Sequence, residues 1–308
     1  MELPVLQRPA DGQRKPGWLK VKLPKGTGLQ KFARVRQTLQ ENGLHTICEE
    51  GRCPNIHECW SGGTATFLAM GDVCTRGCRF CNVKTAAKGI ALDEKEPEKI
   101  ARAVKDWGLK CVVITSVDRD DLPDQGSEHF AKIIRAVKCE SPETIVEVLI
   151  PDFRADTECL KRIAEAKPDV ISHNVEVVKR LQFKVRDARA SYENSLAVLE
   201  NVKKLDSKIF TKSSLMVGLG ETFEAVCEAM DGLRRRSVDF LTIGQYLQPT
   251  PMQIAVQEFV PPERFEEWRK VGEEKGFLYV ASGPFVRSSY KAGELFIESV
   301  VKGRGAVG

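Results

Sequence analysis

Six of the ten cysteines in this 308-residue chain fall within one short stretch, between Cys48 and Cys81. They form two groups of three with the spacings Cx4Cx5C and Cx3Cx2C, namely Cys48, Cys53 and Cys59, then Cys74, Cys78 and Cys81. Thiolates are ligands for soft or borderline metals, so the pattern predicts zinc or iron-sulfur chemistry. A fold that hosts this chain must bring both triads to places where metal can bind.

Each triad stops at three ligands, whereas a structural zinc ion takes four, usually as two close pairs. Only Cys78 and Cys81 form a CxxC pair. A cubane cluster has four irons, so three thiolates leave one iron open for another ligand, and this favours iron-sulfur clusters. Zinc remains the alternative, with His57 as a possible fourth ligand in the first triad.

The remaining cysteines do not predict a disulfide framework. The chain is long, and its N-terminus lacks the apolar core of a signal peptide. The other four cysteines are scattered through apolar or helical stretches, as reduced thiols are, at Cys111, Cys139, Cys159 and Cys227.

The second triad reads Cys74-Thr-Arg-Gly-Cys78-Arg-Phe80-Cys81, with an aromatic residue directly before the last cysteine. This motif resembles the signature of the radical S-adenosylmethionine (radical SAM) enzymes. In that family the three cysteines hold a 4Fe-4S cluster whose open iron is chelated by the amino and carboxylate groups of SAM. One electron from the cluster then cleaves SAM to methionine and a 5'-deoxyadenosyl radical. The resemblance places Phe80 among the cofactor-binding residues.

The first triad, Cys48-Glu-Glu-Gly-Arg-Cys53-Pro-Asn-Ile-His-Glu-Cys59, is similar to the auxiliary-cluster motif of the lipoyl synthases. Residues Arg287-Ser288-Ser289-Tyr290 resemble the RSSY motif of the same family. By this resemblance Ser289 is the fourth ligand of an auxiliary 4Fe-4S cluster, with Ser288 as the other candidate. Without the resemblance, both serines would be read as N-caps of a final helix.

The resemblance implies a radical SAM sulfur transferase with two 4Fe-4S clusters. It would insert sulfur at C6 and C8 of an octanoyl group carried on a lysine, with the auxiliary cluster as the sulfur donor. The implied partners are octanoylated lipoyl domains of 2-oxoacid dehydrogenases, the glycine-cleavage H protein, an electron donor such as flavodoxin or ferredoxin, and an iron-sulfur cluster carrier. The alternatives are another sulfur-inserting radical SAM enzyme, such as a methylthiotransferase or a biotin-synthase-like protein, and a zinc-stabilised binding module.

The net charge is only +4, but nine Lys or Arg and one acid, Asp11, lie between Arg8 and Arg36. This basic arm is either a solvated segment or a docking element for an acidic partner. Nucleic acid is not expected, because the arm carries only Trp18 and Phe32 as possible stacking residues. No apolar run approaches a membrane span, so we expect a cytoplasmic monomer without membrane contact.

Strand and helix patterns alternate from residue 64 onward. Six consecutive strand-helix units predict parallel strands, hence an α/β fold, and the resemblance implies a partial (βα)6 TIM-type barrel with N- and C-terminal extensions. The expected parts are 1–63 with the basic arm and first motif, 64–261 as the barrel, and 262–308 with the RSSY motif. The expected strands are 64–70, 111–116, 144–150, 169–174, 210–218, 240–246 and 277–282, and the expected helices are 31–42, 98–107, 127–138, 157–166, 191–205, 222–235 and 262–274, with a closing helix after the RSSY motif.

Unusual polar residues follow the ends of these strands, where α/β barrels carry their chemistry. We expect SAM to contact residues after the second, fourth and fifth strands, namely Thr115, Ser116, Asp118, Asn174, Glu176 and Gly218. His173 reads as a core histidine, and Asp118, Asp120 and Asp121 could equally be a solvated turn. Gly218 and Gly220 would let the backbone approach SAM, with Glu221 capping the next helix. Residues 48–59 carry Gly51 and Pro54 and are expected to form a loop.

Overall fold

The computed structural model describes residues 15–20, 26–63 and 65–289. Its main element is one eight-stranded sheet in the order β1-β2-β5-β6-β7-β8-β9-β10. All neighbours from β2 to β10 are parallel, while β1 pairs with β2 antiparallel. The strands are β1 (His45–Thr46), β2 (Thr66–Ala69), β5 (Cys111–Ser116), β6 (Ile145–Leu149), β7 (Val170–Ser172), β8 (Phe210–Val217), β9 (Phe240–Gln245) and β10 (Tyr279–Gly283), and a separate pair is formed by β3 (Val73–Cys74) and β4 (Lys84–Thr85).

Helices connect the parallel strands and begin and end at residues that favour those positions. Asp156, Ser191 and Thr222 each accept backbone N–H groups at a helix start. Among the described residues, no helix is both long enough and apolar enough to cross a membrane. The helices are α1 (Thr27–Asn42), α2 (Ile47–Glu50), α3 (Ile56–Ser61), α4 (Glu96–Trp107), α5 (Ser127–Glu140), α6 (Thr157–Glu165), α7 (Gln182–Val185), α8 (Tyr192–Leu205), α9 (Phe223–Arg234) and α10 (Pro262–Glu274), with 3-10 turns η1 (Gly17–Leu19), η2 (Phe153–Ala155) and η3 (Lys179–Leu181).

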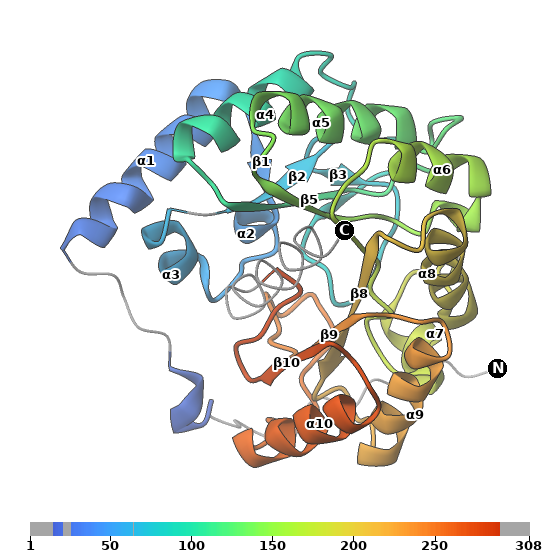
Figure 1. Ribbon diagram of the computed structural model, residues 1–308. Coiled ribbons are helices and arrows are strands. Elements are labelled where there is room, and N and C mark those ends of the chain that lie inside the picture. Colours follow the sequence, from blue (N-terminus) through green and yellow to red (C-terminus); the bar gives the residue numbers. More distant parts are fainter. Residues whose placement is uncertain (1–14, 21–25, 64, 290–308) are drawn as a thin grey trace.

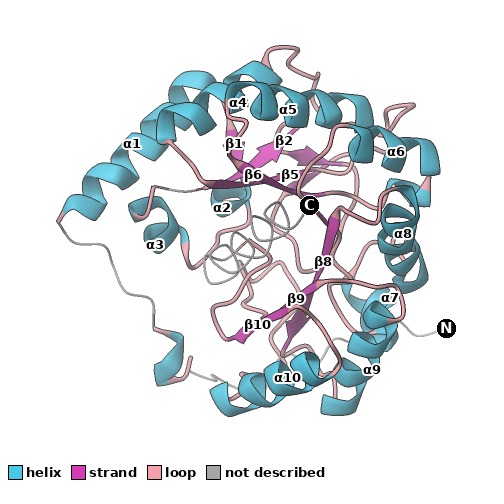
Figure 2. Ribbon diagram, in the orientation of Figure 1, coloured by secondary structure: helices cyan, strands magenta, loops and turns pink. Residues whose placement is uncertain are grey.

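The strands form an inner arc and the longer helices cover its outer side (Figures 1 and 2). The edges of the sheet are β1 and β10, and no pairing between described strands joins them. This open sheet of parallel strands agrees with the α/β fold that the strand-helix units predict and with the partial barrel that the resemblance implies. The last expected strand, 277–282, also belongs to the sheet, because β10 pairs with β9 in register from Tyr279 to Gly283.

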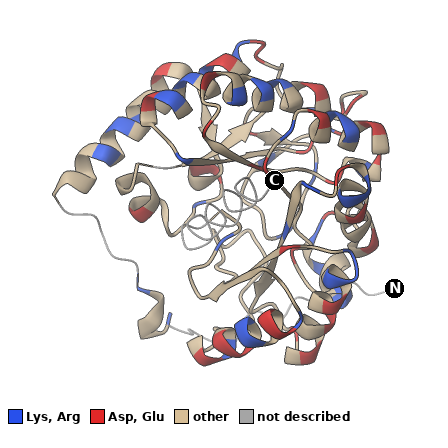
Figure 3. Cartoon of the chain, in the orientation of Figure 1, with Lys and Arg blue, Asp and Glu red and all other residues tan. Residues whose placement is uncertain are grey.

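The barrel strands are buried because helices cover their outer side. Charged residues of both signs lie along these outer helices (Figure 3). The apolar residues of β5 and β6 pack against α4, α5 and α6, whereas those of β8 and β9 pack against α9 and α10. The helices therefore pack against the sides of the strands, and the polar residues lie at the carboxyl ends of the strands.

One expectation about local structure is wrong. Residues 48–59 are not a single loop, because α2 and α3 occupy most of this stretch. The Thr46 hydroxyl caps α2 by accepting the N–H of Glu49. Gly51 and Pro54, which suggested a loop, lie in the short gap between the two helices. Gly51 and Pro54 therefore separate two short helices and do not prevent either helix from forming.

The segment from Pro284 to Ser289 leads from the β10 edge of the sheet to β2, near its other edge. Phe285 accepts a hydrogen bond from the Asn55 side-chain amide at 2.7 Å. Ser289 meets Thr66 at the start of β2. Gly244 of β9 makes room for this crossing, because a Cβ there would lie 2.0 Å from the carbonyl oxygen of Val286. Tyr290 and the expected closing helix lie outside the described residues.

Candidate functional site: two cysteine triads at the ends of one strand

The second triad follows β2 and is held by contacts with distant loops. The N–H of Thr75 donates to the carbonyl of Asp118 after β5. The N–H of Asp187 donates to the sulfur of Cys78 at 3.3 Å, and the N–H of Arg79 donates to the carbonyl of Val185. The loop after β5 and the segment after α7 therefore fix the cysteine loop from two sides.

All three thiols of this triad are substantially buried and protonated in the absence of metal. Burial, helped by the Asp118 carboxylate, raises the pKa of Cys74 to about 12. Burial likewise raises the pKa of Cys78 to about 12 and that of Cys81 above its usual range. A thiolate ligand must lose its proton, and the positive charge of the irons in a bound cluster would favour that loss.

Arg76, between Cys74 and Cys78, is the centre of a buried ion-pair network. Its guanidinium lies 2.9 Å from a carboxylate oxygen of Asp120, 2.8 Å from Asp152 and 3.3 Å from Asp118. The Arg76 guanidinium holds the pKa of Asp152 at about 2, although burial acts in the opposite direction. Two of the strand-end loops are thereby tied to the cysteine motif through charge-assisted hydrogen bonds.

Asp118 is therefore not a solvated turn. Burial raises its pKa to about 6, against the effect of Arg76, and its carboxylate faces the sulfur of Cys74 at 3.8 Å. Asp120 is also engaged, with Arg76 on one side and Arg154 on the other. Asp121 pairs with Arg119. Asp120 and Asp121 do lie in a turn, which the N–H of Leu122 closes by donating to the carbonyl of Arg119, but both carboxylates are in ion pairs and are mostly shielded from solvent.

Two predicted SAM contacts have buried polar atoms without a partner among the described residues. They are the hydroxyl oxygen of Ser116 and the amide oxygen of Asn174. A buried polar atom without a hydrogen bond is costly, so both atoms fit a polar ligand bound at the carboxyl ends of β5 and β7. Thr115 differs, because its hydroxyl already donates to the carbonyl of Leu149 at 2.9 Å.

Glu176 lies beside Asn174, whose amide nitrogen donates to its carboxylate at 3.1 Å. Burial raises the pKa of Glu176, and the Arg186 guanidinium opposes that shift. The backbone of Glu176 is in the left-handed region, with φ of 65°, and is held by hydrogen bonds with β8. A non-glycine residue kept in this region marks a constrained position.

His173 is a core histidine, as the sequence suggests. Its two ring nitrogens contact the Ile150 carbonyl at 2.9 Å and the Ser195 hydroxyl at 3.0 Å. Burial lowers its pKa to about 4, with the Arg186 charge acting in the same direction. This ring is therefore neutral at neutral pH and fully used by the protein.

Gly218 has a structural requirement of its own. Its φ is 95°, and a Cβ there would lie 2.1 Å from the side-chain nitrogen of Gln245. The Glu221 carboxylate accepts the N–H groups of Gly218 and Leu219, so the expectation that it caps the next helix is wrong. That cap is Thr222, whose hydroxyl accepts the N–H of Ala225. The contact of Gly218 with SAM stays a prediction, as does that of Phe80. Phe80 packs against the hydrophobic core formed by residues of β8, β9, α9 and α10.

The first triad lies where the C-terminal segment reaches β2. Burial, with nearby Cys53, raises the pKa of the Cys48 thiol to about 11, whereas the adjacent backbone and side chain of Thr66 act to lower it. The Thr66 hydroxyl donates its proton to the hydroxyl of Ser289 at 2.9 Å. Thr66 therefore links the first cysteine of the triad to the serine that the resemblance designates as the fourth ligand.

A cation from the same segment also approaches this triad. Burial raises the pKa of Cys53, while the Arg287 charge lowers it. Arg287 is anchored by donating to the Val286 carbonyl at 2.6 Å. Soft sulfur donors, a hydroxyl and a nearby cation together fit an anionic iron-sulfur cluster. His57, the possible zinc ligand, instead stacks its ring on Phe32 at 5.4 Å.

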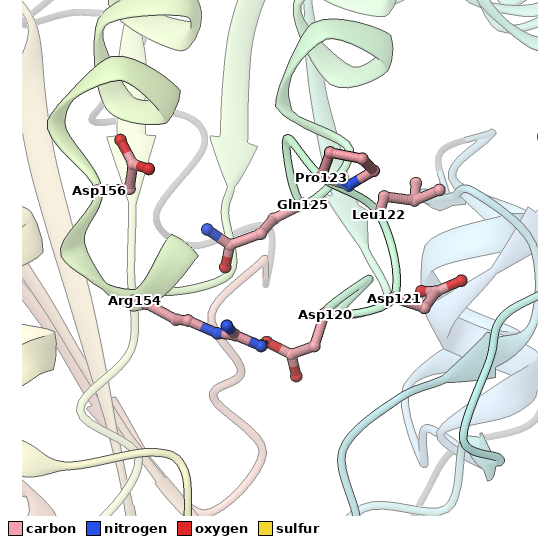
Figure 4. A pocket seen from close by; sticks show the side chains of 7 residues that line it. All are labelled: Asp120, Asp121, Leu122, Pro123, Gln125, Arg154 and Asp156. Atoms are coloured by element: carbon pink, nitrogen blue, oxygen red, sulfur yellow. Dashed lines mark hydrogen bonds and ion pairs between the residues drawn. The ribbon is translucent and has the colours of Figure 1, made fainter.

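A pocket of about 580 Å³ lies outside the network around Arg76 (Figure 4). It lies between the loop after β5 and the η2 turn, and Asp120 and Arg154 point toward one another across it. The pocket is lined by Asp120, Asp121, Leu122, Pro123, Gln125, Arg154 and Asp156. None of these lining residues is a predicted cluster ligand.

Sequence reasoning missed several residues that organise the site. Arg76 and Asn55 lie inside the two cysteine motifs. Their positions between predicted ligands could have identified them as site residues. Thr66 lies in a strand that reads only as apolar and β-branched, and Arg186 lies in a loop without a motif. No sequence signal identifies either of these two. None of the ten cysteines, all of which lie in the described part of the chain, is in a disulfide.

Comparison with known families agrees with both motifs. Residues 68–233 match the radical SAM superfamily, and residues 4–53 match the N-terminal domain of lipoyl synthase of the radical SAM family. A lipoyl synthase of Anaeromyxobacter sp. is 53% identical over 291 residues, covering 94% of this chain and 98% of that protein. The mitochondrial lipoyl synthase of Homo sapiens is 51% identical over 296 residues, covering 94% of this chain and 79% of that protein.

Solved structures share the fold at low sequence identity. Methylornithine synthase superposes with a TM-score of 0.54 at 13% identity, covering 81% of this chain and 77% of that chain. The FeFe-hydrogenase maturase HydG from Carboxydothermus hydrogenoformans gives 0.54 at 13% identity, covering 88% and 79%. These likenesses concern the barrel alone.

Proposed function

The chain belongs to the lipoyl synthase family of radical SAM enzymes, and from this premise we propose which residues perform its reaction. The reaction inserts two sulfur atoms, at C6 and C8, into an octanoyl group carried on a lysine of a lipoyl-carrier protein. Unactivated C–H bonds resist acid-base chemistry, so this substrate requires radical chemistry.

Cys74, Cys78 and Cys81 would hold the radical SAM cluster, and Cys48, Cys53, Cys59 and Ser289 the auxiliary cluster. When bound, the first cluster with SAM supplies the radical, and the second supplies the sulfur. The observation that carries this assignment is the hydrogen bond between Thr66 and Ser289, because Thr66 also contacts the Cys48 thiol. Serine oxygen is a harder ligand than thiolate, which suits an iron that must be released.

The residues around the second triad would bind and orient SAM. The unpartnered oxygen of Asn174 and the carboxylate of Glu176 can accept hydrogen bonds from the ribose hydroxyls or the amino group. The free hydroxyl of Ser116 adds a donor or acceptor at the end of β5, two strands away in the sheet. Asp118, held by Arg76, places negative charge beside Cys74.

The substrates we propose are octanoylated lipoyl domains of 2-oxoacid dehydrogenases and the glycine-cleavage H protein. A flavodoxin or ferredoxin would supply electrons, and an iron-sulfur cluster carrier would rebuild the auxiliary cluster. A monomeric state and a cytoplasmic location stay predictions.

The test uses anaerobically reconstituted protein with SAM, dithionite and an octanoylated lipoyl domain. Mass spectrometry of the domain should detect the gain of two sulfur atoms. Metal and sulfide analysis should find about eight irons per chain, as two 4Fe-4S clusters require. One or two zinc ions without sulfide would support the zinc-module alternative, and no sulfur gain by the domain would refute the proposed function.

A further inference from the structure

Phe183 and Met252 are the most exposed large apolar side chains among the described residues, at 83% and 89%. Phe183 lies in the short helix α7, and Met252 lies in the loop after β9. Isolated surface apolar residues are common and need no explanation. These two differ because the segments that carry them both bond to the same loop of the second cysteine triad.

The segment of Phe183 contacts this loop on one side. Val185, two residues later, accepts the N–H of Arg79 at 2.8 Å. Asp187 donates its N–H to the sulfur of Cys78 at 3.3 Å. A short covalent and hydrogen-bonded route therefore connects exposed Phe183 to a sulfur that would ligate the radical SAM cluster. Hydrogen bonds to such sulfurs help to set cluster potentials.

The segment of Met252 contacts the same loop elsewhere. The N–H of Ile254 donates to the carbonyl of Arg79 at 2.9 Å. The side-chain amide of Gln253 donates to the carbonyl of Cys81 at 3.3 Å. Both exposed apolar side chains thus belong to segments fixed on the residues between Cys78 and Cys81.

The surface of these segments exposes positive charge. Arg79 and Lys184 are exposed, and neither side chain has an ion-pair partner among the described residues. The Arg189 side chain is 47% exposed, whereas its two acidic partners, Asp187 and Asp120, are only 13% and 7% exposed. An approaching protein would therefore meet the cations before the acids.

We propose that this surface is the docking site of an acidic one-electron carrier protein with a flavin or iron-sulfur centre. We call it the electron-entry face and define it by Arg79, Phe183, Lys184, Arg189 and Met252. The inference rests on the proposed function, which requires an outside electron at the second triad. Complementary charge would orient the carrier, and the two apolar side chains would form the dry centre of the contact.

The electron balance is simple. The reduced carrier loses one electron and is oxidised by one unit. The iron-sulfur cluster that Cys78 would ligate would gain this electron and be reduced by one unit, with no proton or group transferred. The short route through Asp187 and Cys78 makes this side of the loop the point of entry.

The test compares two electron sources on the reconstituted holoenzyme. The variant is Phe183→Ala with Lys184→Glu, and neither residue belongs to the proposed cofactor or substrate site. With reduced flavodoxin at low salt, we expect 5'-deoxyadenosine formation to slow about tenfold or more, because steering by charge has been reversed. With dithionite, the rate should stay within about twofold of the wild type. Lys132→Glu on α5, an exposed lysine with the same change of charge, is the control.

Binding gives a second readout that does not depend on turnover. Calorimetry of oxidised flavodoxin with the holoenzyme should give a Kd about tenfold weaker for the double variant, and an unchanged Kd for Lys132→Glu. Met252→Ala should weaken binding without altering its salt dependence, since no charge changes. Unchanged Kd and flavodoxin-driven rate in the double variant would overturn the proposal.

A different occupant of the face would be recognised by its own result. If the double variant raised KM for the octanoylated domain equally with dithionite and flavodoxin, the face would bind the acyl carrier, and the proposal would be wrong. If wild-type enzyme formed no product even with dithionite, the proposed function would fail, whereas the flavodoxin Kd would still test the docking site.

Discussion

The hydroxyl of Thr66 donates a hydrogen bond to the hydroxyl of Ser289 at 2.9 Å, although 223 residues separate them. Thr66 also lies beside the thiol of Cys48, whose pKa it lowers against the larger effect of burial. The start of the first barrel strand is therefore in contact with the N-terminal motif and with the end of the described chain. A ligand set drawn from residues so far apart depends on the crossing of the C-terminal segment.

Ser289→Ala should abolish sulfur insertion while SAM cleavage by the second triad continues. The variant lacks the oxygen that would ligate the auxiliary cluster, but it changes nothing around Cys74. Mass spectrometry of the lipoyl domain and chromatography of 5'-deoxyadenosine separate the two activities. Ser288→Ala removes the other candidate hydroxyl and is the matched control, which should keep product formation within about twofold of the wild type because it leaves the proposed ligand Ser289 in place. Normal product yield from Ser289→Ala would refute the ligand assignment.

Gly244→Ala should displace the C-terminal segment, because its Cβ would lie 2.0 Å from the backbone oxygen of Val286. A backbone atom cannot move aside as easily as the end of a flexible side chain. The whole segment that carries Val286 and Ser289 should therefore be displaced. We expect iron content to fall from about eight to about four per chain, since one of two 4Fe-4S clusters loses its site.

Gly283→Ala is the matched control for this change, because Gly283 is the β10 partner of Gly244. A Cβ at Gly283 has its nearest contact at 3.4 Å, with a side-chain methyl of Val286, so it needs little movement. Iron content near eight in both variants would mean that the crossing segment is not needed for the auxiliary cluster.

Arg76→Met should be strongly destabilising, because it leaves the carboxylates of Asp118, Asp120 and Asp152 without their shared buried cation. Removing one partner from a buried ion pair typically costs about 3–5 kcal/mol. Urea unfolding of the variant should show this loss. Arg269→Met breaks two surface ion pairs on α10 and should leave the unfolding midpoint nearly unchanged. Equal effects of the two substitutions would contradict the buried network.

His173 should make stability fall as the pH drops below neutrality. Its folded-state pKa of about 4 is below the unfolded value of 6.5, so only the unfolded chain binds a proton between them. The contribution is complete above pH 6.5 and is lost as the pH falls toward 4. At pH 5 the loss is about 2 kcal/mol relative to pH 7.5.

His173→Gln should remove that part of the pH dependence, because the amide does not titrate in this range. The comparison is urea unfolding of wild type and variant at pH 7.5 and pH 5, both with clusters loaded, so that common contributions cancel. A stability loss between the two pH values that is the same in both proteins would exclude this role for His173.

Periodicity in the sequence was sufficient to predict an α/β fold with parallel strands, whereas the partial barrel was implied by the family resemblance. The strand β5 has the predicted bounds, Cys111–Ser116, because an apolar β-branched run is bounded by polar and turn residues. The assignment of the two cysteine triads as cluster ligands, made from their spacing, stays a prediction. The prediction of a loop over Cys48–Cys59 was wrong, because helix-breaking residues also occur between two short helices. Only the Thr46 cap favours the first of these helices, α2.

The contacts that assemble the site could not be read from the sequence. Arg76 pairs with carboxylates from two different loops, and Thr66 meets Ser289 across the sheet. Such pairings depend on where the chain brings distant residues, not on local pattern. By contrast, the resemblance had already singled out Ser289, and the structure adds the neighbour that holds it.

The crossing of the C-terminal segment also sets an order of events during synthesis. The hydrogen bond between Asn55 and Phe285 cannot form until Phe285, 230 residues later in the chain, has been synthesised. At typical translation rates this delay is about 10–50 s, while the barrel strands are already emerging. The thiols of the first triad therefore spend that interval without the serine proposed as their fourth ligand, so an auxiliary cluster held by all four proposed ligands could be completed only late in the maturation of a newly made chain.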